Sequence, residues 1–412
     1  MFRRHIEQFV TDAIKHFPVI LLTGPRQIGK STLVSNAFLD KGYSYISFDD
    51  KLELNTALND PRAFLEAHPA PLIIDEAQKA PSLFPEIERL VNALRLKKGN
   101  KASNGMFILT GSQRDKLLSE SQESLAGRVG IIDMSDLSLN EILGFENDPF
   151  HVDYLDSSTR SSRYKISPEG IFEYIVKGFF PAVHDDDGMN LPLFYSSYIT
   201  TYFEKDLKEM IDVRDELKFL DFIKILASNT GQELVYDNYS KQIGVSSNTI
   251  KAWVSVLTKT GVIYLVEPYH EDSITKRVVQ RKKMYFFDTG LAAYLCGVDS
   301  AKTLEKSFLK GRFFETFVFN EIRKSFLNAG LNQKIYYYRD CNQNEVDMVL
   351  LRDGKLSCVE IKSGQNFNAS ATKAFALLSS TKYEVGKNAI VCTAEKPSIL
   401  NDGTIVMPFF AI

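Results

Sequence analysis

Short, nearly continuous apolar runs alternate with amphipathic stretches along the first 145 residues. The runs cover residues 19–23, 45–48, 72–75 and 107–110, and helical patterns separate them. Strands that are buried on both faces of a parallel sheet carry such runs, because helices cover the sheet from either side. The pattern therefore predicts that residues 1–145 form an α/β domain with a doubly wound parallel sheet.

The next section of the chain, residues 146–300, begins with a polar linker or surface loop at about 146–165 and is mostly helical in pattern from about residue 170. Within it, residues 239–265 follow the order helix, turn, helix, strand, with Gly244 in the turn. Apolar residues keep helical spacing along one face of the second helix. Residues 262–266 and 283–287 then flank a basic, irregular stretch in the manner of a β-hairpin wing. We therefore expect a helical linker and a winged-helix domain over this section.

The last section, residues 301–412, predicts a smaller α/β domain. A helical pattern at 310–327 is followed by strand patterns at 335–339, 345–351 and 355–362, a helix near 369–378 and a strand at 389–393. The dipeptide Asp353-Gly354 separates the second and third of these strands and favours a two-residue hairpin turn. We therefore expect these two strands to pair in antiparallel fashion.

Composition and charge narrow the classes of function. The 412 residues carry 49 basic and 52 acidic side chains, for a net charge of −3, so nucleic-acid contact must come from local patches. The four cysteines form no C-x-x-C pair and the six histidines no H-x-x-x-H pair, which argues against a zinc ribbon or a disulfide framework. No apolar run is long enough to span a membrane, so we expect a cytoplasmic protein without membrane contact.

Residues 24–31 match the pattern G-x-x-x-x-G-K-[ST], directly after one predicted strand and before a predicted helix. In that setting the backbone N–H groups at the helix start surround phosphate oxygens, Lys30 bridges the β- and γ-phosphates of ATP and Ser31 binds Mg²⁺. Glycine at positions 24 and 29 lets the main chain approach the phosphates. The residues expected to bind the nucleotide are Gly24, Pro25, Arg26, Gln27, Ile28, Gly29, Lys30, Ser31 and Thr32.

Further candidate site residues lie at or near the ends of later predicted strands. Asp75 and Glu76 follow an apolar run, and we expect Asp75 to hold Mg²⁺ through water and Glu76 to polarise the attacking water. Thr110 ends the next such strand and is expected to sense the γ-phosphate. Arg128 is a candidate arginine finger, acting in its own subunit or in a neighbouring one. The alternative is an ordinary solvated loop arginine.

The first 145 residues resemble the AAA-type branch of P-loop ATPases. The motifs that carry this resemblance are Gly24-Pro25-Arg26-Gln27, Asp75-Glu76-Ala77-Gln78 and Leu109-Thr110-Gly111-Ser112. Nearly the whole chain is similar to a bacterial and archaeal family that joins this ATPase to a C-terminal domain of unassigned function. Further matching positions are Tyr202-Phe203, Asp206, 287–291, 345–347 and 360–362. The resemblance implies ATP binding and hydrolysis.

The hairpin expected around Asp353-Gly354 brings two carboxylates against each other. Counting outward from the turn, Asp347 stands opposite Glu360, and Glu345 stands opposite Lys362. Two carboxylates at a cross-strand pair repel each other unless a cation lies between them. The pair is therefore a candidate metal site.

Asp347 and Glu360-x-Lys362, with Glu315 on the preceding helix, have the form of the PD-(D/E)xK nuclease core, which implies a restriction-endonuclease-like domain. We expect Glu315, Asp347 and Glu360 to bind Mg²⁺, and Glu360 and Lys362 to be catalytic, with Lys362 stabilising the pentavalent phosphate or positioning the water. Two alternatives stay open. One is a solvated hairpin face, and the other is a domain that keeps the fold and only binds nucleic acid or a protein partner.

A basic cluster adjoins the candidate wing. Its members are Lys276, Arg277, Arg281, Lys282 and Lys283. One interpretation places the helix after Ser246 in a DNA major groove and the basic cluster near phosphates. The other is a solvated loop beside a winged helix that packs near the nucleotide site as a rigid lever.

Together these patterns predict an ATPase that uses ATP and Mg²⁺ to control a winged-helix and nuclease-like region acting on nucleic acid. The competing hypothesis is a nucleotide-controlled switch or scaffold, in which the nuclease-like domain is catalytically silent and binds a protein partner. Assembly into a homo-oligomer is compatible with either hypothesis, because an arginine finger often acts between subunits.

Overall fold

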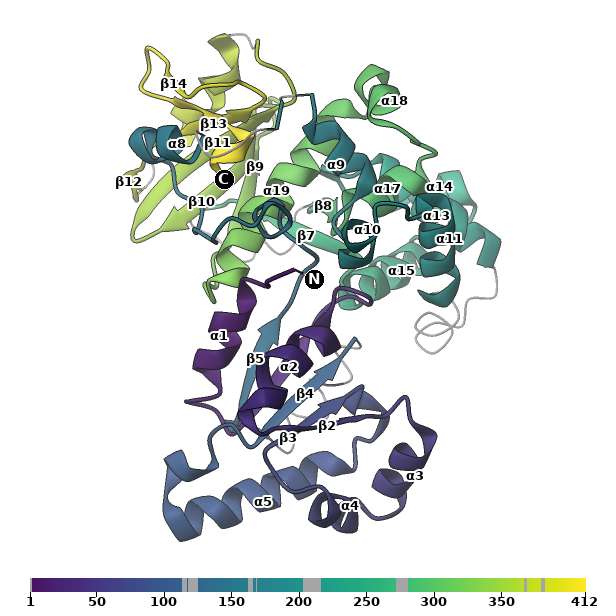
Figure 1. Ribbon diagram of the computed structural model, residues 1–412. Helices are drawn as coiled ribbons and strands as arrows, with labels where there is room; N and C mark the ends of the chain where they lie inside the picture. The colour runs from purple at the N-terminus through teal and green to yellow at the C-terminus, as the bar shows by residue number, and fades with distance from the viewer. Residues whose placement is uncertain are drawn as a thin grey trace. The chain divides into compact units, whose positions relative to one another are not determined.

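The chain forms two compact units in the computed structural model (Figure 1). The described residues are 2–112, 117, 125–161, 166–167, 169–202, 216–271, 281–366, 369–378 and 382–412. The first unit comprises Met1–Glu146 with Lys259–Gly261 and Leu327–Gly330, and the second comprises Asn147–Thr258, Val262–Phe326 and Leu331–Ile412. This division runs beside the predicted boundary at residues 145 and 146. Phe203, Asp206, Lys276 and Arg277 lie outside the described residues.

The first unit is built on a five-stranded parallel sheet in the order β2-β3-β4-β1-β5. The strands are β1 (Val19–Thr23), β2 (Ser44–Ser47), β3 (Leu72–Asp75), β4 (Phe107–Gly111) and β5 (Val129–Asp133). Every residue of β1, β3 and β4 is buried, as their continuous apolar runs predict. Since parallel strands all point the same way, the ends of β1, β3 and β4 meet at one edge of the sheet.

Helices cover both faces of this sheet (Figure 1). They are α1 (Ile6–Ala13), α2 (Lys30–Phe38), α3 (Lys51–Asn59), α4 (Pro61–Ala67), α5 (Leu83–Lys98) and α7 (Leu139–Leu143). Phe64 of α4 and Ile87 of α5 pack with Leu21 of β1 in one apolar core. Ile20 and Leu22 are also buried and point to the opposite face, because side chains alternate along a strand. The predicted α/β class with a doubly wound parallel sheet is confirmed for this unit.

Strand β5 was not predicted from the apolar pattern. Gly130 interrupts its apolar run, and Ile131 in the middle of the strand is 43% exposed. A Cβ at position 130 would come within 3.0 Å of the side chains of Ile20 and Phe17, so close packing requires the glycine. An edge strand with a glycine and an exposed isoleucine shows neither a continuous apolar run nor a regular alternation.

The second unit begins with helices, in agreement with the helical pattern. They are α8 (Tyr154–Ser161), α9 (Ile171–Lys177), α10 (Pro181–Asp185), α11 (Leu191–Tyr202), α13 (Glu216–Ser228), α14 (Tyr236–Ile243), α15 (Ser247–Lys259), α17 (Thr289–Leu295), α18 (Ala301–Lys306) and α19 (Lys310–Asn328). Gly244, with a φ of 72°, forms the turn between α14 and α15. Strands β7 (Ile263–Pro268) and β8 (Lys283–Phe286) follow as an antiparallel pair, so the elements expected for a winged helix occur in the expected order.

The second unit has one mixed sheet in the order β14-β15-β13-β11-β10-β9-β7-β8-β6, with β12 paired to β11. Its other strands are β6 (Gln232–Glu233), β9 (Ile335–Arg339), β10 (Glu345–Arg352), β11 (Lys355–Lys362), β12 (Glu384–Val385), β13 (Ala389–Cys392), β14 (Ser398–Ile399) and β15 (Ile405–Pro408). A 3₁₀ helix, η5 (Ala369–Leu378), replaces the predicted α-helix there. Because β7 pairs with β9, the predicted boundary at residues 300 and 301 divides a single compact unit.

The hairpin of β10 and β11 has the predicted register. Met348 pairs with Val359 and Arg352 with Lys355. The turn residues Asp353 and Gly354 have φ values of 51° and 76°, and two positive φ values are what a type I′ turn requires. The next residues outward from the Met348 pair are Asp347 and Glu360, so the two predicted carboxylates stand on neighbouring strands.

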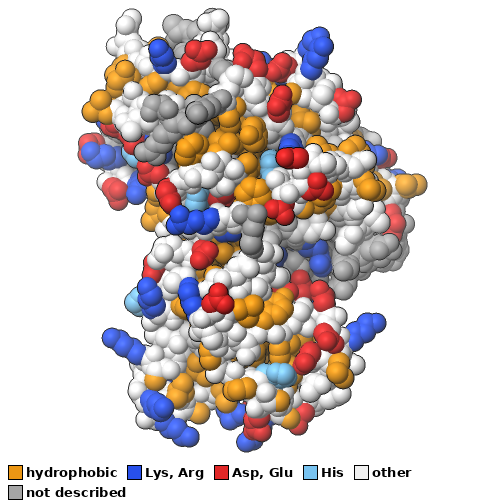
Figure 2. Space-filling model, viewed as in Figure 1, with side chains coloured by type: hydrophobic (Ala, Val, Ile, Leu, Met, Phe, Trp, Pro, Cys, Tyr) orange, Lys and Arg blue, Asp and Glu red, His pale blue; other side chains and the backbone are white. Residues whose placement is uncertain are grey.

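The described helices include none that is both long and apolar enough to cross a membrane. On the face drawn in Figure 2, the described basic and acidic side chains are interspersed and do not gather into one large basic patch. The near balance of 49 basic and 52 acidic side chains agrees with this mixed surface.

Candidate nucleotide site and carboxylate cluster

The loop between β1 and α2 has the backbone of a tight phosphate-binding turn. Gly24, Gln27 and Gly29 have positive φ values of 144°, 60° and 90°. A Cβ at position 24 would lie 2.3 Å from the carbonyl oxygen of Met134. The backbone of Met134 therefore also requires a glycine at this position. The loop ends at the N-terminus of α2, where backbone N–H groups and the helix dipole favour an anion.

Lys30 is folded over this loop. Its Nζ donates hydrogen bonds to the carbonyl oxygens of Gly24 at 2.9 Å and Pro25 at 2.6 Å. The side chain is buried, and its ammonium is therefore held next to the backbone of the loop that is predicted to bind the phosphates. The Lys30 ammonium reaches phosphate oxygens bound in this loop by exchanging its hydrogen-bond partners, without leaving the loop.

Asp75 is the centre of a hydrogen-bond network at the ends of three strands. Ser31 Oγ lies 3.0 and 2.9 Å from its two carboxylate oxygens, and the hydroxyl of Tyr45 donates to Oδ2 at 2.9 Å. Thr110 Oγ1 donates to Oδ1. Burial, together with the charge of Asp75, raises the pKa of Tyr45 to about 12, so Tyr45 stays a donor. Tyr45 was not among the predicted site residues.

The Ser31 hydroxyl and the Asp75 carboxylate fit a magnesium ion. Both are hard oxygen ligands, which Mg²⁺ prefers, and Mg²⁺ usually keeps several waters alongside one or two protein oxygens and the phosphates. The hydroxyl of Thr110 points at Asp75, so its predicted contact with the γ-phosphate requires it to leave this partner. That contact, and the metal roles of Ser31 and Asp75, stay predictions.

Glu76 has a left-handed backbone, with φ and ψ of 57° and 40°. Residues other than glycine rarely adopt this conformation, and it costs about 1–3 kcal/mol when it is held at a functional site. Gln78 Nε2 donates to Glu76 Oε2. Gln78 is buried, and its Oε1 has no hydrogen-bond partner among the described residues. Gln78 therefore orients the carboxylate of Glu76, which is predicted to polarise water. The sequence pattern did not reveal this role of Gln78.

Arg128 lies at the wrong edge of the sheet for a role in its own nucleotide site. It directly precedes β5, which runs parallel to β1, and its carbonyl accepts from Val19 N at the start of β1. The phosphate loop follows the other end of β1, about 15 Å away at roughly 3.3 Å per residue. The guanidinium is held by Asn92 Oδ1 at 2.9 Å and Glu88 Oε1 at 3.3 Å. This placement argues against action within one subunit, and the arginine-finger role of Arg128 stays a prediction.

A buried arginine at the start of the chain supports the back of the phosphate loop. Arg4 donates to the carbonyl oxygens of Ile28 and Ser135, each at 2.7 Å, and to Glu141 Oε1 at 3.1 Å. Burial works to raise the pKa of Glu141, but the charge of Arg4 and hydrogen bonds from Ser138 and His5 lower it. Ser138 and Glu141 form a capping box, whose S-x-x-E pattern is visible in the sequence. The arginine partner was not predictable from that pattern.

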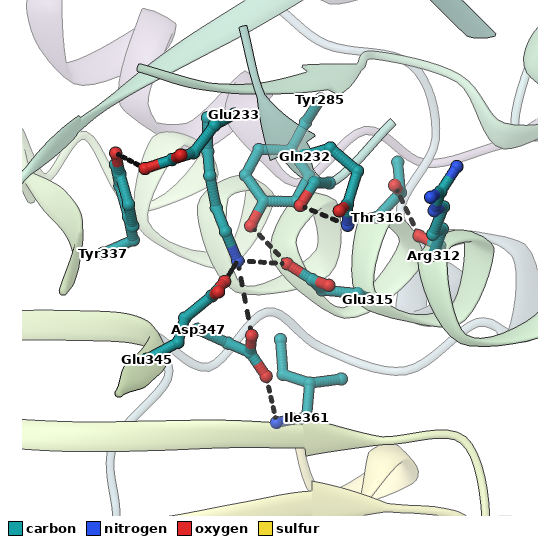
Figure 3. Close-up of polar contacts among 12 residues, drawn as sticks. Gln232, Glu233, Tyr285, Arg312, Glu315, Thr316, Tyr337, Glu345, Asp347 and Ile361 are labelled. Carbon is teal, nitrogen blue, oxygen red and sulfur yellow. Dashed lines mark hydrogen bonds and ion pairs between the residues drawn. The ribbon is translucent and has the colours of Figure 1, made fainter. Parts of the chain in front are cut away.

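A second group of charged side chains lies in the second unit, around Lys283 of β8. Lys283 Nζ lies 3.0 Å from Glu315 Oε1, 2.5 Å from Glu345 Oε1 and 3.3 Å from Asp347 Oδ1. Figure 3 shows the three carboxylates pointing toward one another. We call Glu315, Glu345 and Asp347 the carboxylate cluster. Lys283 is only 2% exposed, so its predicted place near DNA phosphates is wrong.

Charge and burial oppose each other at the carboxylate cluster. Burial works to lower the pKa of Lys283, but the negative charges around it raise this pKa well above its usual value. Burial raises the pKa of Glu315, and the charge of Lys283 opposes that rise. Tyr285 OH donates to Glu315 Oε1 at 2.7 Å, and burial followed by the charge of Glu315 raises the pKa of this tyrosine. The ammonium is therefore the form of Lys283 that this cluster stabilises.

Glu360 and Lys362 lie beside the carboxylate cluster on β11. Lys362 Nζ is 2.5 Å from Glu360 Oε1, and Ile361 N donates to Asp347 Oδ2 at 2.9 Å. Glu360 Oε2 is buried and has no hydrogen-bond partner among the described residues. Burial and the nearby charge of Asp347 raise the pKa of Glu360 to about 8. The predicted catalytic roles of Glu360 and Lys362 stay predictions.

The cluster as arranged does not fit a divalent metal ion. Glu315 and Asp347, two of the three predicted Mg²⁺ ligands, are already bound to the Lys283 ammonium. In the described part of the chain, no three or more His, Cys, Asp or Glu side chains are grouped as ligands of a metal ion. A dication placed beside an ammonium in a buried site is strongly repelled. The metal-binding roles of Glu315, Asp347 and Glu360 stay predictions, and this arrangement argues against them.

The rest of the basic cluster is only partly described. Arg281 is exposed and lies 3.9 Å from Glu233, and Lys282 pairs with Glu267 at 3.3 Å. Both side chains have carboxylate neighbours, and surface pairs of this kind contribute about 0–1 kcal/mol. Their predicted contact with DNA phosphates is untested.

Three segments of the chain match known domain families. Residues 16–143 match the AAA domain, and residues 168–302 and 310–412 match two domains of unknown function, DUF8612 and DUF4143. The first match supports the assignment of the first unit as an AAA-type P-loop ATPase domain. The other two assign no activity to the second unit.

Two relatives match nearly the whole chain, and both are named as uncharacterized proteins. Rv2008c of Mycobacterium tuberculosis and Mb2031c of Mycobacterium bovis are both 26% identical over 407 residues, which cover 98% of this chain and 83% of each relative. A solved Walker-type ATPase of Pyrococcus abyssi, PABY2304, is 14% identical, with a TM-score of 0.44, and the match covers 70% of this chain and 94% of that chain. A TM-score this low supports no argument about function.

Proposed function

We propose that this chain binds ATP with Mg²⁺ at the phosphate loop and hydrolyses it. The observation that carries the proposal is the meeting of Lys30, Ser31 and Asp75 at one edge of a parallel sheet. The match of residues 16–143 to the AAA domain supports it. Bound Mg²⁺ supplies charge neutralisation for the phosphates.

Each residue of the nucleotide site then has a defined role. Backbone N–H groups at the start of α2 and the Lys30 ammonium bind phosphate oxygens. Ser31 and Asp75 hold the metal, and Tyr45 and Thr110 fix the carboxylate of Asp75 by hydrogen bonds. Glu76, oriented by Gln78, accepts a hydrogen bond from the attacking water and aligns it with the γ-phosphate.

Two substitutions test this assignment. Lys30→Ala removes the cation that binds the β- and γ-phosphates, so ATP binding is lost. Glu76→Gln keeps binding and stops turnover, because an amide does not polarise the water. Lys41→Ala changes a lysine outside the phosphate loop, beside Phe38, and is the matched control. Phosphate release that continues unchanged in both Lys30→Ala and Glu76→Gln would falsify the assignment.

We further propose that nucleotide state controls the second unit and that this unit binds nucleic acid. Support for nucleic acid rests on the order of elements from α14 to β8 and on Arg281 and Lys282 at its surface. Strong stimulation of ATP turnover by DNA supports this proposal. Indifference to DNA, with a protein partner captured only in the ATP state, supports the switch or scaffold hypothesis instead.

Cleavage of the nucleic acid is a separate proposal. It is supported by the placement of Asp347, Glu360 and Lys362 on the paired strands β10 and β11. If the unit cleaves, Mg²⁺-dependent nicking of DNA disappears in Glu360→Ala and in Lys362→Ala. If the wild-type chain cleaves neither DNA nor RNA, the unit only binds.

A further inference from the structure

The carboxylate cluster already has a cation, and the chain itself supplies it. An ammonium has three N–H donors and no acceptor. Lys283 Nζ has one carboxylate oxygen within 3.3 Å from each of Glu315, Glu345 and Asp347. Lys283 Nζ donates hydrogen bonds to Glu315 and Asp347 and forms an ion pair with Glu345, so the three carboxylates share one positive charge.

The surroundings hold Lys283 in this position. Its ammonium lies 5.7 Å from the centre of the Tyr337 ring, a distance at which the ring attracts a cation. Tyr285, which donates to Glu315, stacks on Phe319 with a centroid distance of 4.0 Å and an interplanar angle of 9°. The Lys283 side chain is only 2% exposed, so its ammonium has little contact with solvent where it lies.

The remaining charges around the cluster are also paired within the chain. Arg339 lies 3.4 Å from Glu345, and Lys362 lies 2.5 Å from Glu360. Two lysines and an arginine therefore face four carboxylates. Mg²⁺ binds oxygen at about 2.1 Å, which is much closer than an ammonium nitrogen lies to its acceptors. A divalent ion enters this group only if Lys283 leaves.

We infer that Lys283 takes the place of a divalent metal ion in the carboxylate cluster, so that the second unit holds no divalent ion there. The inference goes beyond the proposed ATPase function and does not depend on it. It opposes the separate cleavage proposal, which requires a divalent ion beside Asp347 and Glu360. It has a direct consequence: a neutral side chain of similar length at position 283 leaves Glu315 and Asp347 without the ammonium and Glu345 with Arg339 alone, and Mn²⁺ or Mg²⁺ then binds in the vacated place.

The test counts Mn²⁺ ions bound to the full chain without nucleotide, by the loss of the free-ion signal in electron paramagnetic resonance. Lys283→Met is expected to bind one more Mn²⁺ per chain than the wild type, and the double variant Lys283→Met with Asp347→Asn loses that extra ion. Lys283→Arg keeps a cation and gains none. Lys282→Met, on the neighbouring residue that pairs with Glu267, is the matched control and also gains none.

A second measurement holds even if Lys283→Met fails to fold. Asp347→Asn and Glu315→Gln are made in the wild-type chain, and each is expected to bind as many Mn²⁺ ions as the wild type, because the cluster holds none while Lys283 is present. Loss of one Mn²⁺ in either variant overturns the inference. A folded Lys283→Met that gains no ion overturns it as well.

Discussion

Ser31 Oγ lies within 3.0 Å of both carboxylate oxygens of Asp75, which connects the first turn of α2 to the end of β3. The two residues are 44 positions apart in the chain. Parallel strands bring them together, because β1 and β3 both pair with β4 and end at the same edge. Ser31 and Asp75 are the two side chains that would hold Mg²⁺ in the proposed function.

Asp75→Asn is predicted to weaken the magnesium-dependent part of nucleotide binding. The amide has one acceptor oxygen in place of two and no charge, so the metal loses its carboxylate support. We expect the affinity for Mg²⁺–ATP to fall about 10- to 100-fold, with little change for ATP in the presence of a chelator. Asp49→Asn, on an exposed acid that pairs with Lys79, is the control. An equal loss with and without Mg²⁺ would point to a structural role for Asp75.

Gln78→Leu is predicted to reduce turnover without reducing ATP affinity. Leucine cannot donate to Glu76 Oε2, so the carboxylate loses its orientation. A misplaced catalytic group costs about tenfold to a hundredfold in rate. Steady-state kinetics give kcat and KM for ATP, and a separate binding titration gives the affinity for ATP. A drop in affinity together with kcat would contradict a positioning role specific to Glu76.

Arg4→Met is predicted to destabilise the first unit. The substitution leaves Glu141 buried without its cation and the carbonyl of Ile28 without its donor, and loss of one partner of a buried pair costs about 3–5 kcal/mol. Arg3→Met is a matched control, because the Arg3–Glu146 pair is exposed and contributes less than about 1 kcal/mol. Denaturant unfolding followed by circular dichroism distinguishes the two. Equal unfolding free energies for the two variants would contradict the buried role.

The stability of the second unit is predicted to fall in acid because of His184. Burial lowers the pKa of this histidine to about 4, against 6.5 when unfolded, although its hydrogen bond with Gly178 O opposes the shift. The unfolded state binds the extra proton between these values, so stability is fully present above pH 6.5 and declines toward pH 4. The loss is at most about 3 kcal/mol.

Trp253 gives the readout for this pH dependence. It is the only tryptophan, it is buried, and it lies in the second unit. Its fluorescence during denaturant unfolding is expected to show a flatter pH dependence in His184→Gln than in the wild type. His16→Gln, on an exposed histidine of the first unit, keeps the wild-type profile. Identical profiles for His184→Gln and the wild type would show that other groups cause the acid loss.

Local sequence patterns predicted the parts of the fold that local chemistry determines. The fully buried strands β1, β3 and β4 carry continuous apolar runs, and the Asp353-Gly354 turn determines the register of its hairpin. β5 was missed because packing against Phe17 and Ile20 requires Gly130. The position of Arg128 follows from where β5 begins, so the edge of the sheet at which it lies could not be predicted either.

The prediction that Lys283 lies near DNA phosphates was wrong for a different physical reason. In the sequence it stands beside Arg281 and Lys282, and three adjacent basic residues indicate a solvated surface. It is the first residue of β8, and Tyr285, two positions on, shares its face because side chains alternate along a strand. The K-x-Y spacing is a weak sign of an inward-pointing lysine. The acids that receive it come from α19 and β10, which only the folded sheet brings near.

The central claim is that the phosphate loop binds ATP, and calorimetric titration of the full chain with ATP and Mg²⁺ tests it most directly. The account predicts saturable heat with one nucleotide per chain for the wild type, and none for a folded Lys30→Ala variant. Absence of any heat with the folded wild-type chain, or the same heat with Lys30→Ala, would contradict it.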